Sequence, residues 1–89
     1  MKNFEQRGNQ IRKHAKELVL DYMRSQNECS PNGVGVKQAI IFRECGFDFG
    51  DYPTAKSDNQ QYWVNALIRE LEAEGKVVRL KERGPWRLT

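Results

Sequence analysis

The last third of the chain shows two successive patterns of apolar and polar residues. In the first, apolar residues recur every three or four positions, which predicts an amphipathic helix with one buried stripe. The stripe consists of Val64, Leu67, Ile68 and Leu71. Ser57 or Asp58 can cap the start of this helix, with Gln60 or Gln61 completing a capping box, and Gly75 suits a left-handed stop.

After this helix, apolar residues alternate with basic ones, which predicts a short β-hairpin with its turn at residues 82–84. The alternation predicts that one face of the hairpin is apolar. The members of that face are Val78, Leu80, Trp86 and Leu88. The opposite face is then cationic, and Trp86 is expected to hold the hairpin to the core.

The first half of the chain predicts two further helices. One runs from Gln10 to about Ser25, and its stripe is Ile11, Ala15, Leu18, Val19, Tyr22 and Met23. Leu20 falls near the centre of the polar face, where it is either an ordinary exposed leucine or a self-association contact. Residues 1–9 are polar, and we expect a flexible N-terminus there.

The second helix is expected from Lys37 to about Cys45, ending at Gly46, with Ala39, Ile40 and Phe42 inside. Residues 34–36 are a candidate short strand that pairs with the hairpin. The segment 47–56 is a long connection whose aromatic residues alternate with aspartates. It packs its own aromatics onto the core, serves as a recognition loop for a protein partner, or offers an aromatic platform for bases, although its acidic residues argue against the last.

These elements fit one α+β domain over residues 1–89, because a chain of this length can bury about 60–65% of its unfolded surface. The order helix, short strand, helix, helix, hairpin resembles a winged helix, a three-helix helix-turn-helix core with a C-terminal β-hairpin wing. The net charge is +3, and residues 76–89 hold five basic side chains against Glu82 alone. Positive charge concentrated on the hairpin suits a polyanionic partner.

The third helix and the hairpin supply the residues that are candidates for contacting double-stranded DNA. At 100° per residue, the side opposite the buried stripe presents Tyr62, Asn65 and Arg69, with Gln61 and Ala66 at its edges. Asn and Gln can bond adenine edges, and Arg can bond guanine or phosphate. The cations expected on phosphates are Lys56, Arg79, Lys81, Arg83 and Arg87. The alternative for the helix residues is an ordinary solvated face.

The run from Trp63 to Thr89 resembles part of the N-terminal winged-helix domain of Mrr-type restriction endonucleases. The likeness lies in a leucine-rich helix, a tight glycine turn and the closing residues Arg83-Gly84-Pro85-Trp86-Arg87-Leu88-Thr89. In that family the domain binds DNA and a separate domain carries the nuclease.

A second, partial resemblance is to the Z-form-specific winged helix of double-stranded-RNA adenosine deaminases. Asn65, Pro85 and Trp86 match that pattern, whereas Arg69 and Gly84 stand where it has Tyr and Pro. A nucleic-acid contact for Trp86 in that manner would require an exposed indole ring.

Catalysis and metal binding find little support in the sequence. Cys29 and Cys45, with His14 as the one histidine, do not form the spaced ligand pairs of a zinc site. Glu74-Gly75-Lys76 spells a nuclease-like E-x-K, but at the end of a helix. There is no apolar run long enough for a membrane span and no signal-peptide pattern. We therefore expect a cytoplasmic protein that is not an enzyme and uses no cofactor, metal, membrane or small-molecule substrate.

Non-catalytic binding of double-stranded DNA, compatible with transcription regulation, is the function that these patterns favour. The alternative is a winged-helix protein-interaction module that docks through the 47–56 loop or a helix face. Its partner would be another protein or a second copy of this chain.

Overall fold

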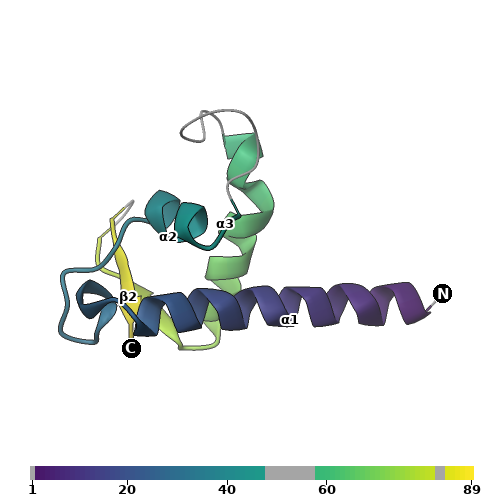
Figure 1. Ribbon diagram of the computed structural model, residues 1–89, viewed down its shortest axis with the longest axis horizontal. Coiled ribbons are helices and arrows are strands. Elements are labelled where there is room, and N and C mark those ends of the chain that lie inside the picture. The colour runs from purple at the N-terminus through teal and green to yellow at the C-terminus, as the bar shows by residue number, and fades with distance from the viewer. Residues whose placement is uncertain (1, 48–57, 82–83) are drawn as a thin grey trace.

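The computed structural model describes residues 2–47, 58–81 and 84–89, with the backbone alone for Lys2 and residues 58–63. These residues form an α+β structure of three α-helices, a short 3-10 helix and an antiparallel hairpin, which confirms the predicted class. The elements are α1 (Lys2–Arg24), η1 (Asn27–Cys29), α2 (Gln38–Glu44), α3 (Asp58–Ala73), β1 (Val77–Arg79) and β2 (Trp86–Leu88). In Figure 1, α2, α3 and the hairpin lie on the C-terminal half of α1.

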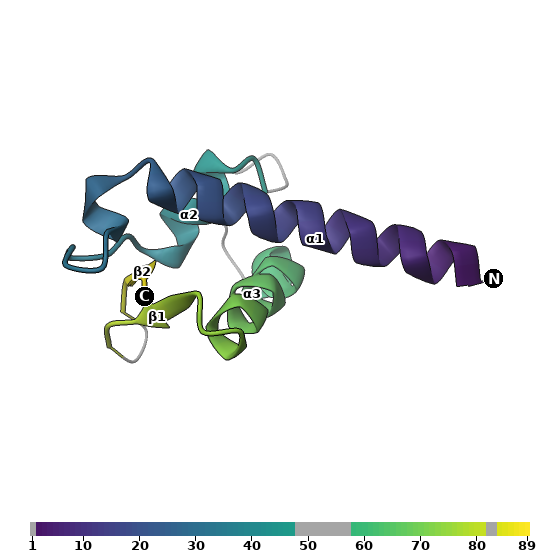
Figure 2. The same cartoon turned by 90° about the horizontal axis from the view of Figure 1, so that it is seen from below.

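The first helix is longer than its apolar periodicity suggested. It begins at Lys2, so the predicted start at Gln10 was wrong. Residues 3–14 are all exposed, and Figure 2 shows this part of α1 projecting beyond α3. Local contacts accompany the extension, since Arg7 lies over the Phe4 ring and Arg12 bonds Asn9. Because this part of the helix is exposed, it lacks the closely spaced apolar residues of a buried stripe, and the sequence does not mark its start.

The side of α1 that packs on the core also differs from the expected one. Val19 and Met23 are fully buried, as predicted, but Leu20 is buried too, with 5% of its surface exposed. Ile11 and Leu18 are instead 68% and 43% exposed. The cause is that α2, α3, η1 and β2 all contact α1, and together they cover a different arc from the one that the apolar periodicity marks.

The second helix shows a similar one-residue error. Ile41 and Phe42 are fully buried, whereas Ile40, which was expected inside, is 41% exposed. The left-handed glycine at Gly46, with a φ of 77°, follows this helix as predicted.

The third helix matches its prediction closely. Its four stripe residues are at most 2% exposed, and Gly75 has a φ of 76° in the turn that ends the helix. The backbone nitrogen of Lys76 donates to the carbonyl of Leu71, which satisfies an end carbonyl of the helix. The expected capping residue Ser57 lies outside the described residues.

The structure confirms that Trp86 faces the core, but in the first strand the inward and outward residues are exchanged relative to the prediction. Val77 pairs with Leu88, Val78 with Arg87, and Arg79 with Trp86. Val77 is therefore on the inner face at 2% exposure, whereas Val78, which was expected inside, is 38% exposed. Arg79 shares the face of Trp86 because directly paired residues of an antiparallel hairpin lie on one side.

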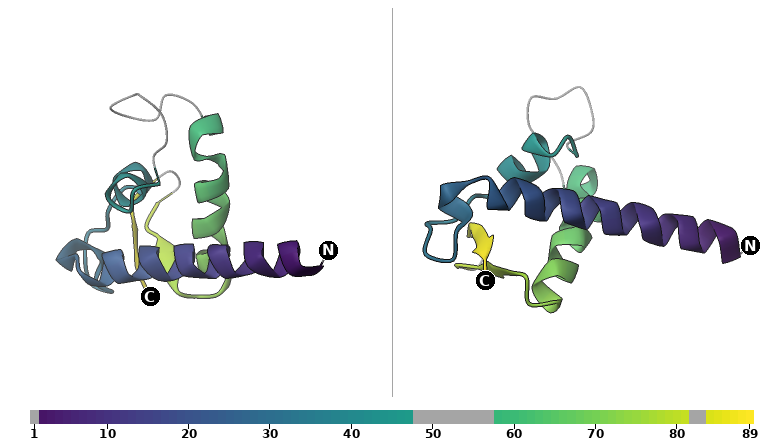
Figure 3. Two further views of the ribbon diagram at one scale, coloured as in Figure 1. Left: turned by 45° about the vertical axis from the view of Figure 1, so that its right-hand side comes forward. Right: turned by 60° about the horizontal axis from the view of Figure 1, so that its bottom comes forward.

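The predicted pairing of residues 34–36 with the hairpin is confirmed, but as an isolated bridge between Val36 and Trp86 and not as a strand. Each donates its backbone N–H to the other's carbonyl, at 2.9 Å. Gly35, with a φ of 86°, lies so close to the second strand that an added Cβ would be 2.8 Å from the Cβ of Pro85. Trp86 consequently joins β2, β1 and the segment before α2. The left view of Figure 3 shows the hairpin between α2 and α3.

Candidate nucleic-acid interface

Trp86 lies beneath a cluster of polar side chains from three elements. Its indole ring is fully buried, and its Nε1 donates to Oε1 of Gln38, the first residue of α2, at 3.2 Å. Nε2 of Gln38 donates in turn to Oδ1 of Asn65 on α3, at 3.1 Å. These bonds connect the hairpin, α2 and α3 through side chains.

Two arginines complete this cluster. The guanidinium carbons of Arg69 and Arg79 lie 5.8 Å and 5.2 Å from the centroid of the Trp86 ring. Such cation–π contacts favour a cation over the indole face. Arg69 also pairs with Glu72, at 3.1 Å between Nη1 and Oε1. Among the described residues, Arg79 has no carboxylate partner, and the cluster therefore carries a net positive charge.

We call this cluster the Trp86 face: Gln38, Asn65, Arg69 and Arg79 around Trp86. It brings together three of the residues singled out from the sequence, and Ala66 is exposed beside Asn65. Gln61 and Tyr62 are part of α3, but their side chains are not described. Lys56 and Arg83 lie outside the described residues.

The cations of the hairpin do not share one surface, contrary to the expected alternation. Arg79 lies on the side of Trp86, and Arg87 on the other side with Val78. Nη1 of Arg87 donates to the carbonyl of Gly33 at 3.0 Å, which ties the hairpin to the preceding loop. Lys81 is exposed after the end of β1. The reversal follows from the pairing of Val77 with Leu88.

Sequence reasoning did not find Gln38. The residue lies in the second predicted helix, and the sequence pattern predicted no partner for its side chain. A signal was nevertheless available, because the predicted pairing of residues 34–36 with the hairpin brings the start of α2 beside Trp86.

Two carboxylates near the C-terminal end of α3, Glu70 within the helix and Glu74 just after it, are directed toward α1. Nζ of Lys16, whose side chain is 18% exposed, lies 2.6 Å from Oε2 of Glu74 and 3.1 Å from Oε1 of Glu70. The hydrogen bond with Glu74 raises the pKa of Lys16 and lowers the pKa of Glu74. Glu70 also approaches Arg12, at 3.7 Å. These carboxylates are thus neutralised by α1 and add little negative charge to the Trp86 face.

The thiols of Cys29 and Cys45 are not activated as nucleophiles. Burial raises the pKa of Cys45 to about 11 and also raises that of Cys29. Both thiols therefore stay protonated at neutral pH, and neither forms a disulfide. Within residues 2–47, 58–81 and 84–89, no three His, Cys, Asp or Glu side chains converge as metal ligands.

The helices in the described part of the chain are too short or too polar to cross a membrane. Comparison of the chain with protein-family models, curated proteins and solved structures gave no match. Inference about function therefore rests on the residues and their geometry.

Proposed function

We propose that this chain is a winged helix-turn-helix domain that binds double-stranded DNA. In this proposal α3 enters the major groove and the β1–β2 hairpin is the wing. The order of α1, the Val36 bridge, α2, α3 and the hairpin supports the fold assignment. The binding is non-catalytic.

The observation that carries the proposal is the convergence of Arg69 and Arg79 over one indole ring, beside the exposed Asn65. Arg69 is already paired with Glu72, whereas Arg79 has no carboxylate partner among the described residues, so the two arginines together carry more positive charge than the one carboxylate neutralises. A phosphate group is a suitable ligand for this remaining charge. Arginine is also the side chain best suited to phosphate oxygens, because its planar N–H groups can form paired hydrogen bonds.

The corrected hairpin changes the roles of the cations. Arg69, Arg79 and the exposed Lys81 are the phosphate contacts that the geometry favours, and Lys56 and Arg83 stay as predictions. Lys37, exposed at the start of α2 next to Gln38, is a further candidate. Arg87 is a structural residue, since its guanidinium is bound to Gly33.

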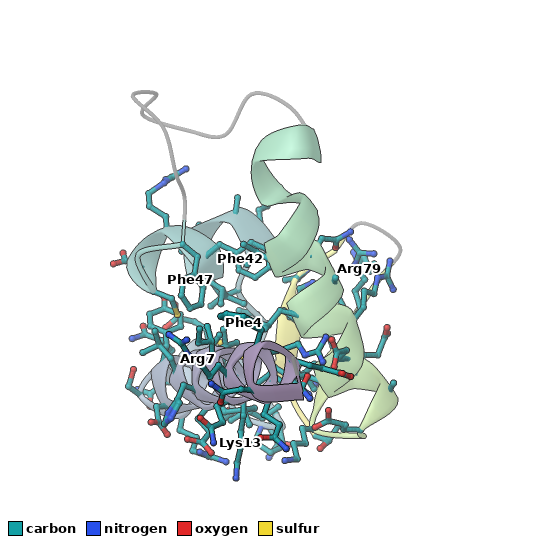
Figure 4. The ribbon with its side chains drawn as sticks, turned by 90° about the vertical axis from the view of Figure 1, so that its right-hand side faces the viewer. Phe4, Arg7, Lys13, Phe42, Phe47 and Arg79 are labelled. Carbon is teal, nitrogen blue, oxygen red and sulfur yellow. The ribbon has the colours of Figure 1, made fainter. Side chains whose placement is uncertain are left out.

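A titration of a labelled random duplex at several salt concentrations tests the proposal. With about four to six phosphates neutralised, log K should fall against log salt with a slope of about −4 to −5. Arg79→Ala should weaken binding to all duplexes and flatten the slope by about one. The matched control is Lys13→Ala, which also removes one positive charge. In Figure 4, Lys13 lies on the side of α1 that faces away from α2 and Arg79. Absence of binding at 50 mM salt and micromolar protein would refute the proposal.

One observation favours the alternative function, protein docking through a helix face. Phe4, Ile11 and Leu18 recur every seven residues on α1 and are 72%, 68% and 43% exposed. Such a line of apolar side chains is the usual contact surface of a helix with another helix. Phe47, at the start of the other expected docking segment, is half-buried against the core. Sedimentation of the wild type beside an Ile11→Glu variant would reveal self-association through α1.

A further inference from the structure

The hydrogen bonds from Trp86 to Asn65 have a fixed direction. An indole nitrogen can only donate, so the atom of Gln38 that faces it must be the oxygen. The amide nitrogen of Gln38 is then the atom that faces Asn65, and it needs an acceptor. Oδ1 of Asn65 supplies this acceptor at 3.1 Å. The buried indole N–H of Trp86 thus determines how the side-chain amides of Gln38 and Asn65 are oriented.

Asn65, the exposed last member of this hydrogen-bond series, consequently has a fixed orientation of its donor and acceptor groups. Asn65 turns its oxygen toward α2 and its NH2 group away from α2. The neighbouring Arg69 and Arg79 carry donors only. On the Trp86 face, both amide oxygens are thus engaged inside the protein, whereas the groups left for a ligand are N–H donors, apart from Glu72, which pairs with Arg69.

We propose that Gln38 is a positioning residue that makes Asn65 present its NH2 group to hydrogen-bond acceptors of the nucleic acid. This inference rests on the proposed DNA-binding function and names the chemistry that the site recognises. The acceptors are N7 and O6 on the major-groove edge of guanine, or phosphate oxygens. Adenine is less favoured than guanine, because its edge offers one donor beside one acceptor and one of the two lone pairs of the Asn65 oxygen already accepts from Gln38.

The variant Gln38→Glu reverses the polarity with almost no change in shape. A carboxylate accepts the Trp86 N–H but cannot donate to Asn65, so Asn65 must turn its NH2 group inward. Gln38→Met removes both bonds without adding charge. Gln6→Glu is the control, because it makes the same chemical change on the projecting part of α1.

Hydrogen exchange of the side-chain amides, followed by NMR in the free protein, tests the positioning role without DNA. In the wild type the Asn65 NH2 protons should exchange as fast as those of an exposed amide. In Gln38→Glu they should slow markedly, and in Gln38→Met and Gln6→Glu they should stay fast. Slow exchange in the wild type, or no slowing in Gln38→Glu, would overturn the assigned direction.

Binding of Asn65→Ala to three duplexes then identifies the source of the acceptors. The probes are a G·C-only duplex, the same duplex with 7-deazaguanine, which lacks N7, and an A·T-only duplex. If guanine supplies the acceptors, the affinity of Asn65→Ala should be roughly 5- to 150-fold below that of the wild type on the G·C duplex, and the loss of affinity should be smaller on the other two. If phosphate supplies them, the loss should be equal on all three.

A loss that is largest on the A·T duplex, or no loss on any duplex, would overturn the proposed ligand chemistry. A wild type that binds none of the three duplexes would instead refute DNA binding itself. The exchange measurement then still decides whether Gln38 orients Asn65, and the two failures are distinguishable.

Discussion

Replacement of Trp86 tests whether its ring belongs to the core or to the binding surface. Trp86 is 0% exposed; its backbone exchanges two hydrogen bonds with Val36, and its ring donates to Gln38 through Nε1. Truncation of such a ring to alanine costs about 3–5 kcal/mol, including the cavity that is left. A domain of this length has a total stability of only about 4–13 kcal/mol. We therefore expect Trp86→Ala to be largely unfolded or to lose its hairpin.

Trp86→Phe separates the ring from its N–H. Phenylalanine keeps much of the buried surface but cannot bond Gln38, so the expected loss is about 1–2 kcal/mol. For a domain of this size, that corresponds to a fall in melting temperature of about 5–15 °C. The variant should stay folded and should keep Arg69 and Arg79 over an aromatic ring.

Urea and thermal denaturation followed by circular dichroism, beside a DNA titration of each variant, provide the measurement. Loss of stability in the order wild type, Phe, Ala supports a core role for the ring. If Trp86→Ala unfolds at the wild-type midpoint and has nevertheless lost its affinity, our reasoning is refuted. The ring would then be a nucleic-acid contact, as the partial resemblance to Z-form binders implies.

Three other measurements test separate parts of the structure. Val77→Ala should cost about 1.5–3 kcal/mol and Val78→Ala less than about 0.5 kcal/mol, because the side chains are 2% and 38% exposed; equal costs would contradict the strand register. The pKa of Glu74 is below its usual 4.5 and that of Lys16 above its usual 10.5, so their mutual stabilisation is complete between these values. It is lost as the pH falls through the lowered pKa or rises through the raised one. The stability difference between wild type and Lys16→Gln should shrink at both extremes, and a difference constant over pH 2–12 would exclude the pair as its cause. Iodoacetamide at pH 8 should label Cys45 much more slowly in the native protein than in urea, since burial raises its pKa to about 11, and equally fast labelling would contradict that burial.

The third helix could be predicted from the sequence because a single buried direction governs it. Its apolar stripe faces one core, and Gly75 marks its end by a backbone conformation that other residues rarely adopt. The first helix could not be predicted to the same degree. Several elements pack around this helix, so Leu20 is buried although it lies outside the main stripe. The projecting half of the helix is exposed on all sides and has no buried stripe.

The prediction of which residues of the first hairpin strand face the core was wrong for a different reason. Val77 and Val78 are adjacent, so either alternation places one valine inside. Leu80 seemed to decide in favour of Val78, but β1 ends at Arg79, and a residue beyond the strand does not share its alternation. An arginine was also expected to face solvent, whereas Arg79 lies over the Trp86 ring, where a guanidinium is a favourable neighbour.

This reversal is what makes the Trp86 face a candidate site. With the expected alternation, Arg79 would point away from α3, and the wing and the helix would present two separate surfaces. With the observed register, Arg79 and Arg69 lie over one ring. The N–H of that ring donates to Gln38, and Gln38 donates in turn to Asn65. The same side chain thus stabilises the core and determines which atoms face a ligand. Changes at Trp86 should therefore affect stability and binding together, whereas changes at Asn65, which is exposed, should affect binding alone.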